Sequence, residues 1–178
     1  MVSYGGKELA NAFRTVRKNT IQVAQDIPEE KYGHLAAPEA RSVGQMLAHV
    51  AISTRFWEEI HKKKLKTLVG FDFFRAIDEF QAEESKKRSK AEIVELLTAE
   101  GEKFASWVET LTPEFLAETV TEADGKTEKT RFERFLGAKE HEMHHRAQLM
   151  LIERQLGIVP HLTRQSQERL AQMKAAKA

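Results

Sequence analysis

The chain has 178 residues, a net charge of +1 from 28 basic and 27 acidic side chains, and no cysteine. The near-neutral charge argues against binding of nucleic acid or membranes through a strong global field. The lack of cysteine excludes disulfides, thiolate nucleophiles and cysteine-ligated metals. Apolar residues make up 41% and glycine and proline are sparse, so the composition predicts one globular domain built mainly of helices.

A first helix is predicted over residues 7–25. The side chains of its predicted buried stripe recur at spacings of three and four. They are Leu9, Phe13, Val16, Thr20 and Val23. Residues 27–41 contain Pro28, Gly33 and Pro38, which is typical of a connector.

A second helix is predicted to begin at Ser42 and to end near His61. Ser42 and Gln45 form a capping-box pattern, in which each side chain accepts a hydrogen bond from the backbone of the other residue. Apolar residues supply its predicted buried side: Val43, Met46, Leu47, Val50, Phe56, Trp57 and Ile60.

The middle of the chain predicts less regular structure. Residues 71–81 fit either a short helix or a packed loop, and residues 85–90 form a charged link. Ser89 and Glu92 make a second capping-box pattern, which opens a helix to about Thr110. Residues 113–130 fit either two short extended pieces around a turn or an exposed loop.

The last long helix is predicted over residues 131–155, where Gly157 would end it. A terminal helix from about Arg164 is expected to close the bundle. The pattern as a whole predicts an all-α fold, a four-helix bundle with at least one crossover connection and short accessory helices. We expect one domain over residues 1–178, with a core at about 5–160 and an accessory helix at about 164–176.

Three histidines crowd into five residues of the last long helix: His141, His144 and His145. At roughly 100° per residue, His141 and His145 lie about 40° apart around the helix and one turn apart along it, so both rings can reach one ion. His144 lies about 60° from His141 on the other side, so all three are not expected to meet one ion.

A metal site needs at least one more ligand from another helix. His49 is the best candidate, because it lies in the middle of an apolar helical segment between Leu47 and Val50. Three neutral imidazoles favour a divalent transition metal over magnesium or calcium. Zinc or nickel is expected, with iron, cobalt or manganese as alternatives. The alternative without a functional role is that these histidines are ordinary core or half-exposed residues.

Other polar residues of the last long helix are candidates for the site. Glu142 lies about 100° from His141 and is expected to be exposed, with a role as a base or as a support for a ligand as the alternative. Arg146 is expected to pair with a carboxylate, and Gln148 to line a pocket. Residues in connectors or at helix ends are expected at the surface, namely His34, His61 and His161.

The segment from His141 to His145 also matches the H-E-x-x-H pattern of zinc proteases. The extended form of that pattern needs glycine and histidine where this chain has Gln148 and Leu151, so it fails. Glu168 is the remaining candidate for a downstream ligand, but it lies in a predicted surface helix. Nucleic-acid binding through residues 62–64 and 86–88 is a further alternative, although short charge runs are usually solvated.

The segment from Ser42 to His49, paired with the late segment from His141 to Leu149, resembles the DinB/YfiT-like superfamily. The resemblance covers the chain from the first helix to Pro160. It implies a four-helix bundle, one metal held by His49, His141 and His145, and a homodimer. Characterised members include metal-dependent thiol transferases. Ala147 departs from the glycine that is common at its position.

The leading hypothesis is therefore a metal-dependent enzyme whose open metal position activates a low-molecular-weight thiol. A metal-dependent hydrolase and a non-catalytic metal-binding or structural bundle are the alternatives. No nucleic-acid or membrane partner is expected, because charge runs and apolar stretches are short. Residues 1–7 lack a signal pattern, so we expect a cytoplasmic protein.

Overall fold

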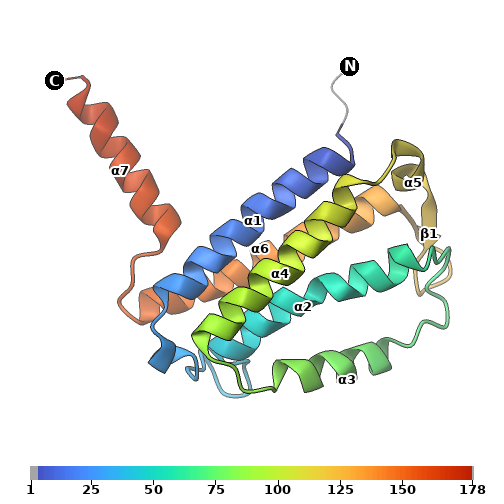
Figure 1. Ribbon diagram of the computed structural model, residues 1–178, viewed down its shortest axis with the longest axis horizontal. Helices are drawn as coiled ribbons and strands as arrows, with labels where there is room; N and C mark the ends of the chain where they lie inside the picture. The colour runs from blue at the N-terminus through green and yellow to red at the C-terminus, as the bar shows by residue number, and fades with distance from the viewer. Residues whose placement is uncertain (1–3, 178) are drawn as a thin grey trace.

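A computed structural model describes residues 4–177; residues 1–3 of the N-terminal segment and residue 178 lie outside it. Four long helices form a bundle (Figure 1). They are α1 (Gly6–Asp26), α2 (Val43–Lys62), α4 (Lys90–Glu109) and α6 (Arg131–Gln155). Helices α1 and α2 occupy opposite corners, and each packs against both α4 and α6. The predicted four-helix bundle is confirmed.

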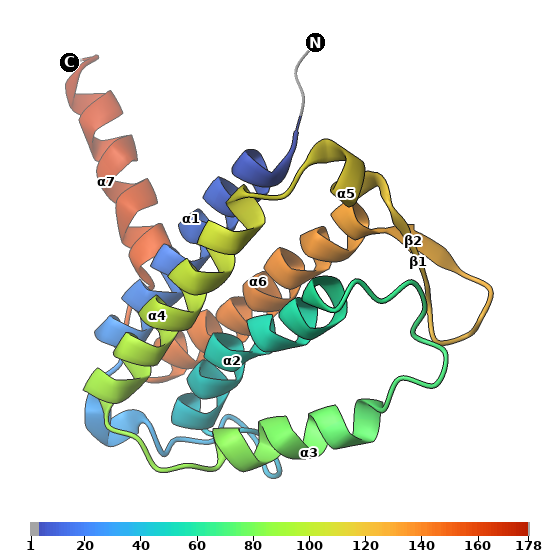
Figure 2. The ribbon, with the colours of Figure 1, turned by 45° about the vertical axis from the view of Figure 1, so that its right-hand side comes forward.

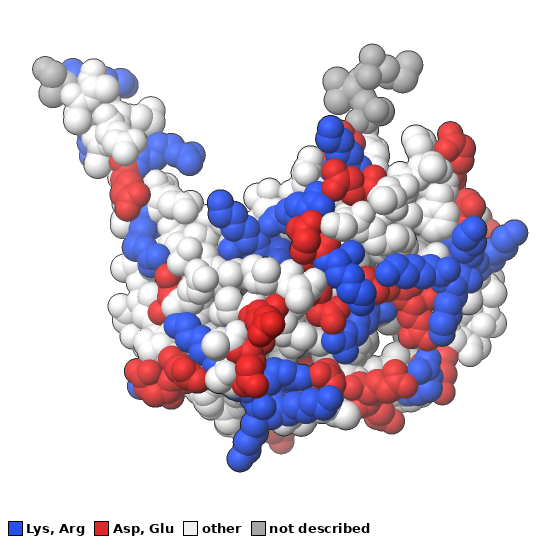
Figure 3. All heavy atoms as spheres, viewed as in Figure 1, with Lys and Arg blue, Asp and Glu red and all other residues white. Residues whose placement is uncertain are grey.

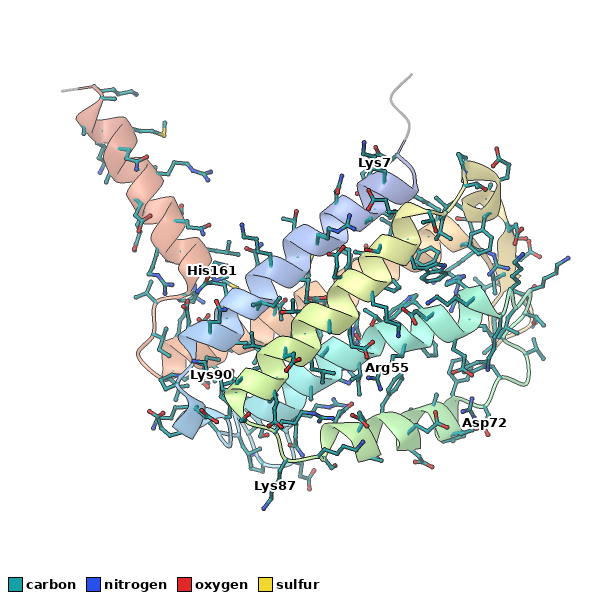
Figure 4. All side chains as sticks on the ribbon, in the orientation of Figure 1. Lys7, Arg55, Asp72, Lys87, Lys90 and His161 are labelled. Atoms are coloured by element: carbon teal, nitrogen blue, oxygen red, sulfur yellow. The ribbon has the colours of Figure 1, made fainter. Side chains whose placement is uncertain are left out.

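Consecutive helices of this bundle do not all alternate in direction, as they would in a simple up-and-down bundle. Helices α1 and α6 run in one direction, and α2 and α4 run in the other (Figures 1 and 2). Neighbouring parallel helices such as α2 and α4 need a long connection between them. Residues 63–89 provide it, and they include α3 (Phe73–Glu84), which begins at the capping residue Asp72 (Figure 4). The predicted crossover is confirmed, and residues 71–81 belong mostly to a helix rather than to a loop.

The two predicted capping boxes are present. Ser42 Oγ accepts from Gln45 N at 3.3 Å, and Ser89 Oγ accepts from Glu92 N at 3.3 Å. A third capping box, in which Thr130 Oγ1 accepts from Glu133 N at 3.1 Å, begins α6. Side-chain caps of this kind satisfy backbone donors that a helix start leaves unpaired, so they fix where α2, α4 and α6 begin.

The predicted apolar stripe of α1 is buried along its length. Its two ends contribute to two separate groups of core side chains. One group lies where α1 ends, around Val23, Leu47 and Leu149. The other lies where α1 begins, around Phe13, Phe104 and Phe135.

Residues 113–130 form α5 (Pro113–Ala117) and a short antiparallel hairpin of β1 (Thr119–Thr121) and β2 (Glu128–Thr130). The register pairs Val120 with Lys129. Of the two alternatives for this segment, the pair of extended pieces is therefore the correct one. Val120 is buried with Ile60 and Leu68, which ties the hairpin to the end of α2.

Helix α7 (His161–Ala175) projects away from the bundle instead of closing it (Figures 1 and 2). Its described residues from Gln165 onward are exposed. The prediction that this helix closes the bundle is wrong, because the part of it from Gln165 onward is mostly polar and offers only Leu170 and Met173 as large apolar side chains.

Two histidines predicted at the surface are buried. His61 is 1% exposed; its Nδ1 lies 3.0 Å from Arg131 Nη1 and its ring packs on Phe135. Burial, together with the nearby arginine charges, lowers the pKa of His61 to about 3. His161, at the base of α7 (Figure 4), lies 3.2 Å from Asn19 Oδ1. Both histidines lie at helix ends that another element covers. The sequence pattern does not show which helix ends are covered in the folded chain.

Acidic and basic side chains alternate over the face shown in Figure 3. Ion pairs join both short basic runs to neighbouring acids: Lys63 to Glu59 at 2.8 Å, and Lys86 to Glu83 at 2.5 Å. Within residues 4–177, no helix combines the length and the apolar character that a membrane span requires.

Candidate metal centre

The structure brings His49, His141 and His145 together between α2 and α6. Each offers a ligand nitrogen, and these three atoms lie within 4.8 Å of one another. His49 Nε2 is 3.1 Å from His141 Nε2, and the ring centroids of His141 and His145 are 4.6 Å apart. The predicted geometry, two histidines one turn apart on α6 facing one from another helix, is therefore what the fold provides.

His144 lies outside this cluster. Its side chain is exposed, and its ring lies beside that of His145, with centroids 5.0 Å apart. The separation of about 60° around the helix that the sequence predicts explains why it turns away from His141.

Two hydrogen bonds orient the clustered rings. His49 Nδ1 is 2.6 Å from Glu84 Oε1, and His145 Nδ1 is 2.8 Å from Gln148 Oε1. Carboxylate and amide oxygens only accept, so each Nδ1 must carry the proton. That tautomer leaves the lone pair of Nε2 on both rings pointing away from these partners and available for a ligand bond.

Burial keeps the centre of the cluster neutral. Burial first, and then the charges of the neighbouring His145, His49 and His144, together lower the pKa of His141 to about 3. Burial also lowers the pKa of His145, although the contact with Gln148 acts in the opposite direction. Neutral imidazole is the form that binds metals.

The donor set fits a first-row transition ion. Zinc–nitrogen bonds of about 2.0–2.1 Å in a tetrahedral site place two ligand nitrogens about 3.3 Å apart, close to the 3.1 Å between His49 and His141. The other ring nitrogen of His141, Nδ1, is buried and lacks a hydrogen-bond partner among the described residues. The three residues can therefore hold one divalent metal ion, although the identity of the ion is not set by this geometry.

The sequence model of the DinB superfamily matches residues 12–149, which run from within α1 to within α6 and include the three histidines. The chain belongs to the DinB superfamily. A search of curated proteins found no significant match.

Solved structures of DinB-like proteins share this fold. YfiT from Bacillus subtilis, described as a "probable metal-dependent hydrolase with an unusual four-helix bundle topology", is 15% identical, with a TM-score of 0.67 over 89% of this chain and 93% of its own. The DinB-like protein YjoA from Bacillus subtilis is 21% identical, with a TM-score of 0.62 over 84% and 92%. An uncharacterised protein from Clostridium difficile 630 is 15% identical, with a TM-score of 0.64 over 86% and 98%.

In this DinB-superfamily chain, one carboxylate links the histidine cluster to the connector that precedes α2. Glu84, in the last turn of α3, accepts from His49 with one oxygen and from Arg41 Nε with the other, at 2.6 Å. Burial raises the pKa of Glu84, but the hydrogen bonds from His49 and Arg41 more than offset that effect, so its net pKa lies below the ordinary value. Glu84 is thus an ionised support for His49.

The cluster borders a pocket of about 590 Å³. His145 lies on its wall, together with Gln148 from α6, Gln45 from α2 and Glu84 from α3. This volume is within the usual range for small-molecule sites. Gln148, which the sequence predicts to line a pocket, lies on the wall of this one.

Two other predictions about α6 are wrong. Glu142 is 1% exposed, not at the surface, because Arg17 of α1 pairs with it at 2.9 Å inside the bundle. Arg146 is half-buried and donates to the carbonyl of Val16 rather than to a carboxylate. Both errors arise because position around α6 alone does not show which neighbouring helix covers that side.

Glu84 and Arg41 were not singled out from the sequence. Glu84 lies beyond the predicted end of its helix and among charged residues that look like a solvated surface. The burial of Arg17 is predictable from the sequence. Arg17 follows Phe13 by four residues and precedes Thr20 by three, so it lies on the buried stripe itself.

Proposed function

We propose that the chain is a divalent-metal-dependent enzyme that joins a low-molecular-weight thiol to a small electrophile. The observation that carries the proposal is the convergence of three histidines at the edge of a pocket large enough for a small molecule. Three protein ligands leave a position open for substrate, which is typical of catalytic metal sites.

Different residues of the chain would bind the metal ion and orient its ligands. His49, His141 and His145 would hold the ion, and zinc or nickel suits this donor set. Glu84 and Gln148 fix the tautomers and ring orientations of His49 and His145. The bound ion would lower the pKa of a thiol and hold it as a thiolate. The sulfur must come from the substrate, because the chain has no cysteine.

Hydrolysis is the second candidate, and the description of YfiT favours it. A hydrolase commonly needs a base to take a proton from water. Both oxygens of Glu84 are engaged and its pKa is lowered, which makes it a weak base. Glu39, the other described acid on the pocket wall, lies at an exposed position. This arrangement favours a thiol, which ionises more readily than water.

A non-catalytic role is the third candidate. Structural zinc sites usually have four protein ligands, whereas three His, Asp or Glu side chains gather here among the described residues. A fourth side chain bound to the ion in a metal-loaded structure would support this role and contradict the enzyme.

The test is an assay on zinc-loaded and nickel-loaded protein. Glutathione, cysteine and other small thiols would be offered with a bimane electrophile, and ester and amide substrates would be offered in parallel. Thiol-dependent turnover that His49→Ala abolishes would support the proposal. Turnover of esters without thiol would favour the hydrolase, and full metal occupancy without turnover on either panel would favour the non-catalytic role.

We also propose a homodimer, on the strength of the family resemblance alone. Light scattering coupled to size exclusion would show twice the mass of one chain if this proposal is right, and the mass of one chain if it is wrong.

A further inference from the structure

The pocket beside the histidine cluster has walls rich in hydrogen-bond donors. It is lined from several elements: Arg41 from the connector before α2, Gln45 from the first turn of α2, and Gln148 from α6 next to His145. The hydrogen-bond donors of these side chains that have no partner in the wall indicate the kind of substrate that would bind there.

The two glutamines are oriented by hydrogen bonds inside the wall. Gln45 Oε1 accepts from Ser42 N at 2.9 Å as part of the capping box. Gln148 Oε1 accepts from His145 Nδ1 at 2.8 Å. Because both oxygens are engaged, each amide is left with its NH₂ group, which only donates.

Arg41 adds charged donors to the same pocket. Its Nε donates to Glu84 Oε2 at 2.6 Å, and its two terminal nitrogens have no hydrogen-bond partner among the described residues. Its side chain is 39% exposed, so a ligand can reach these nitrogens. A guanidinium with both terminal nitrogens unused matches a carboxylate, which accepts two parallel hydrogen bonds.

We propose that this pocket binds a small-molecule substrate through a carboxylate group, which Arg41, Gln45 and Gln148 hold while the reacting end of the molecule lies at the histidine cluster. The inference rests on the proposed function, because it names the substrate class of the same site. Arg41 and His49 share the carboxylate of Glu84, so the anion subsite and the cluster are held at a fixed separation.

The acidic residues that line the pocket do not cancel its preference for a carboxylate. Glu84 already accepts from two cationic or N–H partners and presents no unused oxygen to an incoming anion. Glu39 is the one lining acid with no hydrogen-bonded partner among the described residues. Glu39→Gln should therefore strengthen binding of a carboxylate.

The test is calorimetric titration with succinate and with its neutral diamide, succinamide. Succinate should bind the wild type at least about tenfold more tightly than succinamide, because the donors pair with charge. Arg41→Gln and Gln148→Glu should each weaken succinate binding at least about tenfold. Gln148→Glu keeps an acceptor for His145 Nδ1, and its metal content is measured so that any loss of succinate binding is judged at a known metal occupancy.

Arg55→Gln is the matched control. Arg55 lies on α2 (Figure 4), is 40% exposed and pairs with Glu100 at 2.6 Å, but it faces a different pocket. This variant should bind succinate like the wild type.

The titrations would be run on metal-loaded and on metal-free protein, with metal content measured for each sample. Equal binding of succinate and succinamide, no binding of succinate, or succinate binding that Arg41→Gln leaves unchanged would each overturn the inference. Each of these results can occur with a full metal site, in which case the proposed function stands. A protein that binds succinate through Arg41 but takes up no metal would support the subsite and overturn the proposed function.

Discussion

Arg17 Nε lies 2.9 Å from Glu142 Oε1 at the centre of the bundle, with both side chains almost completely buried. Arg17 also donates to the carbonyls of Leu97 and Val50, so one side chain of α1 contacts α4, α2 and α6. Glu142 follows His141 directly in the sequence. The pair therefore fixes the rotation of α6 that turns His141 and His145 toward His49.

Removing one partner of this pair should be costly. Arg17→Met leaves the Glu142 carboxylate buried without its partner, and we expect the free energy of unfolding to fall by about 3–5 kcal/mol. The double variant Arg17→Met, Glu142→Leu removes both charges and should be more stable than the single variant. Urea denaturation measures both. A single variant that loses less than about 1 kcal/mol would show that the pair does not hold the bundle together.

Gly101 of α4 makes room for Arg17. A Cβ atom at Gly101 would lie 2.7 Å from Arg17 Cγ, and the three helices that bind the guanidinium prevent it from moving aside. We expect Gly101→Ala to destabilise the protein by about 1–3 kcal/mol. In α6, Gly137 has nothing within 4 Å of its Cβ position. Gly137→Ala should be neutral or stabilise by up to about 1 kcal/mol, and the same loss in both variants would argue against the proposed clash.

Glu153 of α6 should make stability depend on pH. It is buried, neither of its carboxylate oxygens has a partner among the described residues, and burial, with the nearby Asp26, raises its pKa to about 7. The native state therefore holds a proton that the unfolded state, with a pKa near 4.5, releases. The contribution of Glu153 to stability is greatest below about pH 4.5 and is lost as the pH rises through about 7.

The variant Glu153→Gln mimics the protonated form and should lose this dependence. We expect it to lie within about 1 kcal/mol of the wild type near pH 5 and to be more stable at pH 8 by up to about 3 kcal/mol, as measured by urea midpoints. Glu140→Gln, an exposed substitution on the same helix, should follow the wild type at both pH values. An equal difference between Glu153→Gln and wild type at pH 5 and pH 8 would rule out titration of Glu153 as the cause.

Glu84 should strengthen metal binding without touching the ion. It accepts from His49 Nδ1, and hydrogen bonds to the far nitrogen of a histidine ligand raise metal affinity. Glu84→Ala is expected to weaken zinc binding about 10–100-fold, measured by competition with a chromophoric chelator. Glu79→Ala changes an exposed acid of the same helix, which pairs with Arg75, and should leave the affinity unchanged. Equal affinities in the two variants would show that Glu84 does not support the site.

The helical framework was readable from the sequence because local signals define it. The capping boxes at Ser42 and Ser89 and the apolar stripe of α1 depend on residues within one or two turns, so the starts of α2 and α4 and the buried face of α1 agree with the structure. The facing of His141 and His145 follows from helix geometry in the same way.

The rest depends on contacts between distant segments. Glu142 and His61 were expected at the surface, yet Arg17 and Arg131 respectively cover them from more than sixty residues away in sequence. Glu84 reaches His49 across 35 residues, and only the path of the crossover places it there. Single-sequence periodicity contains no information on these pairings.

The central claim is that His49, His141 and His145 bind one metal ion. The most direct test is the metal content of tag-free protein by elemental mass spectrometry, for the wild type and for the alanine variant of each histidine, with His144→Ala as the matched control. We predict about one ion per chain in the wild type and in His144→Ala, and loss of the ion in each of the other three variants while circular dichroism shows that the helices remain. A folded wild type that binds no metal after reconstitution with zinc, nickel, cobalt and iron would contradict the claim.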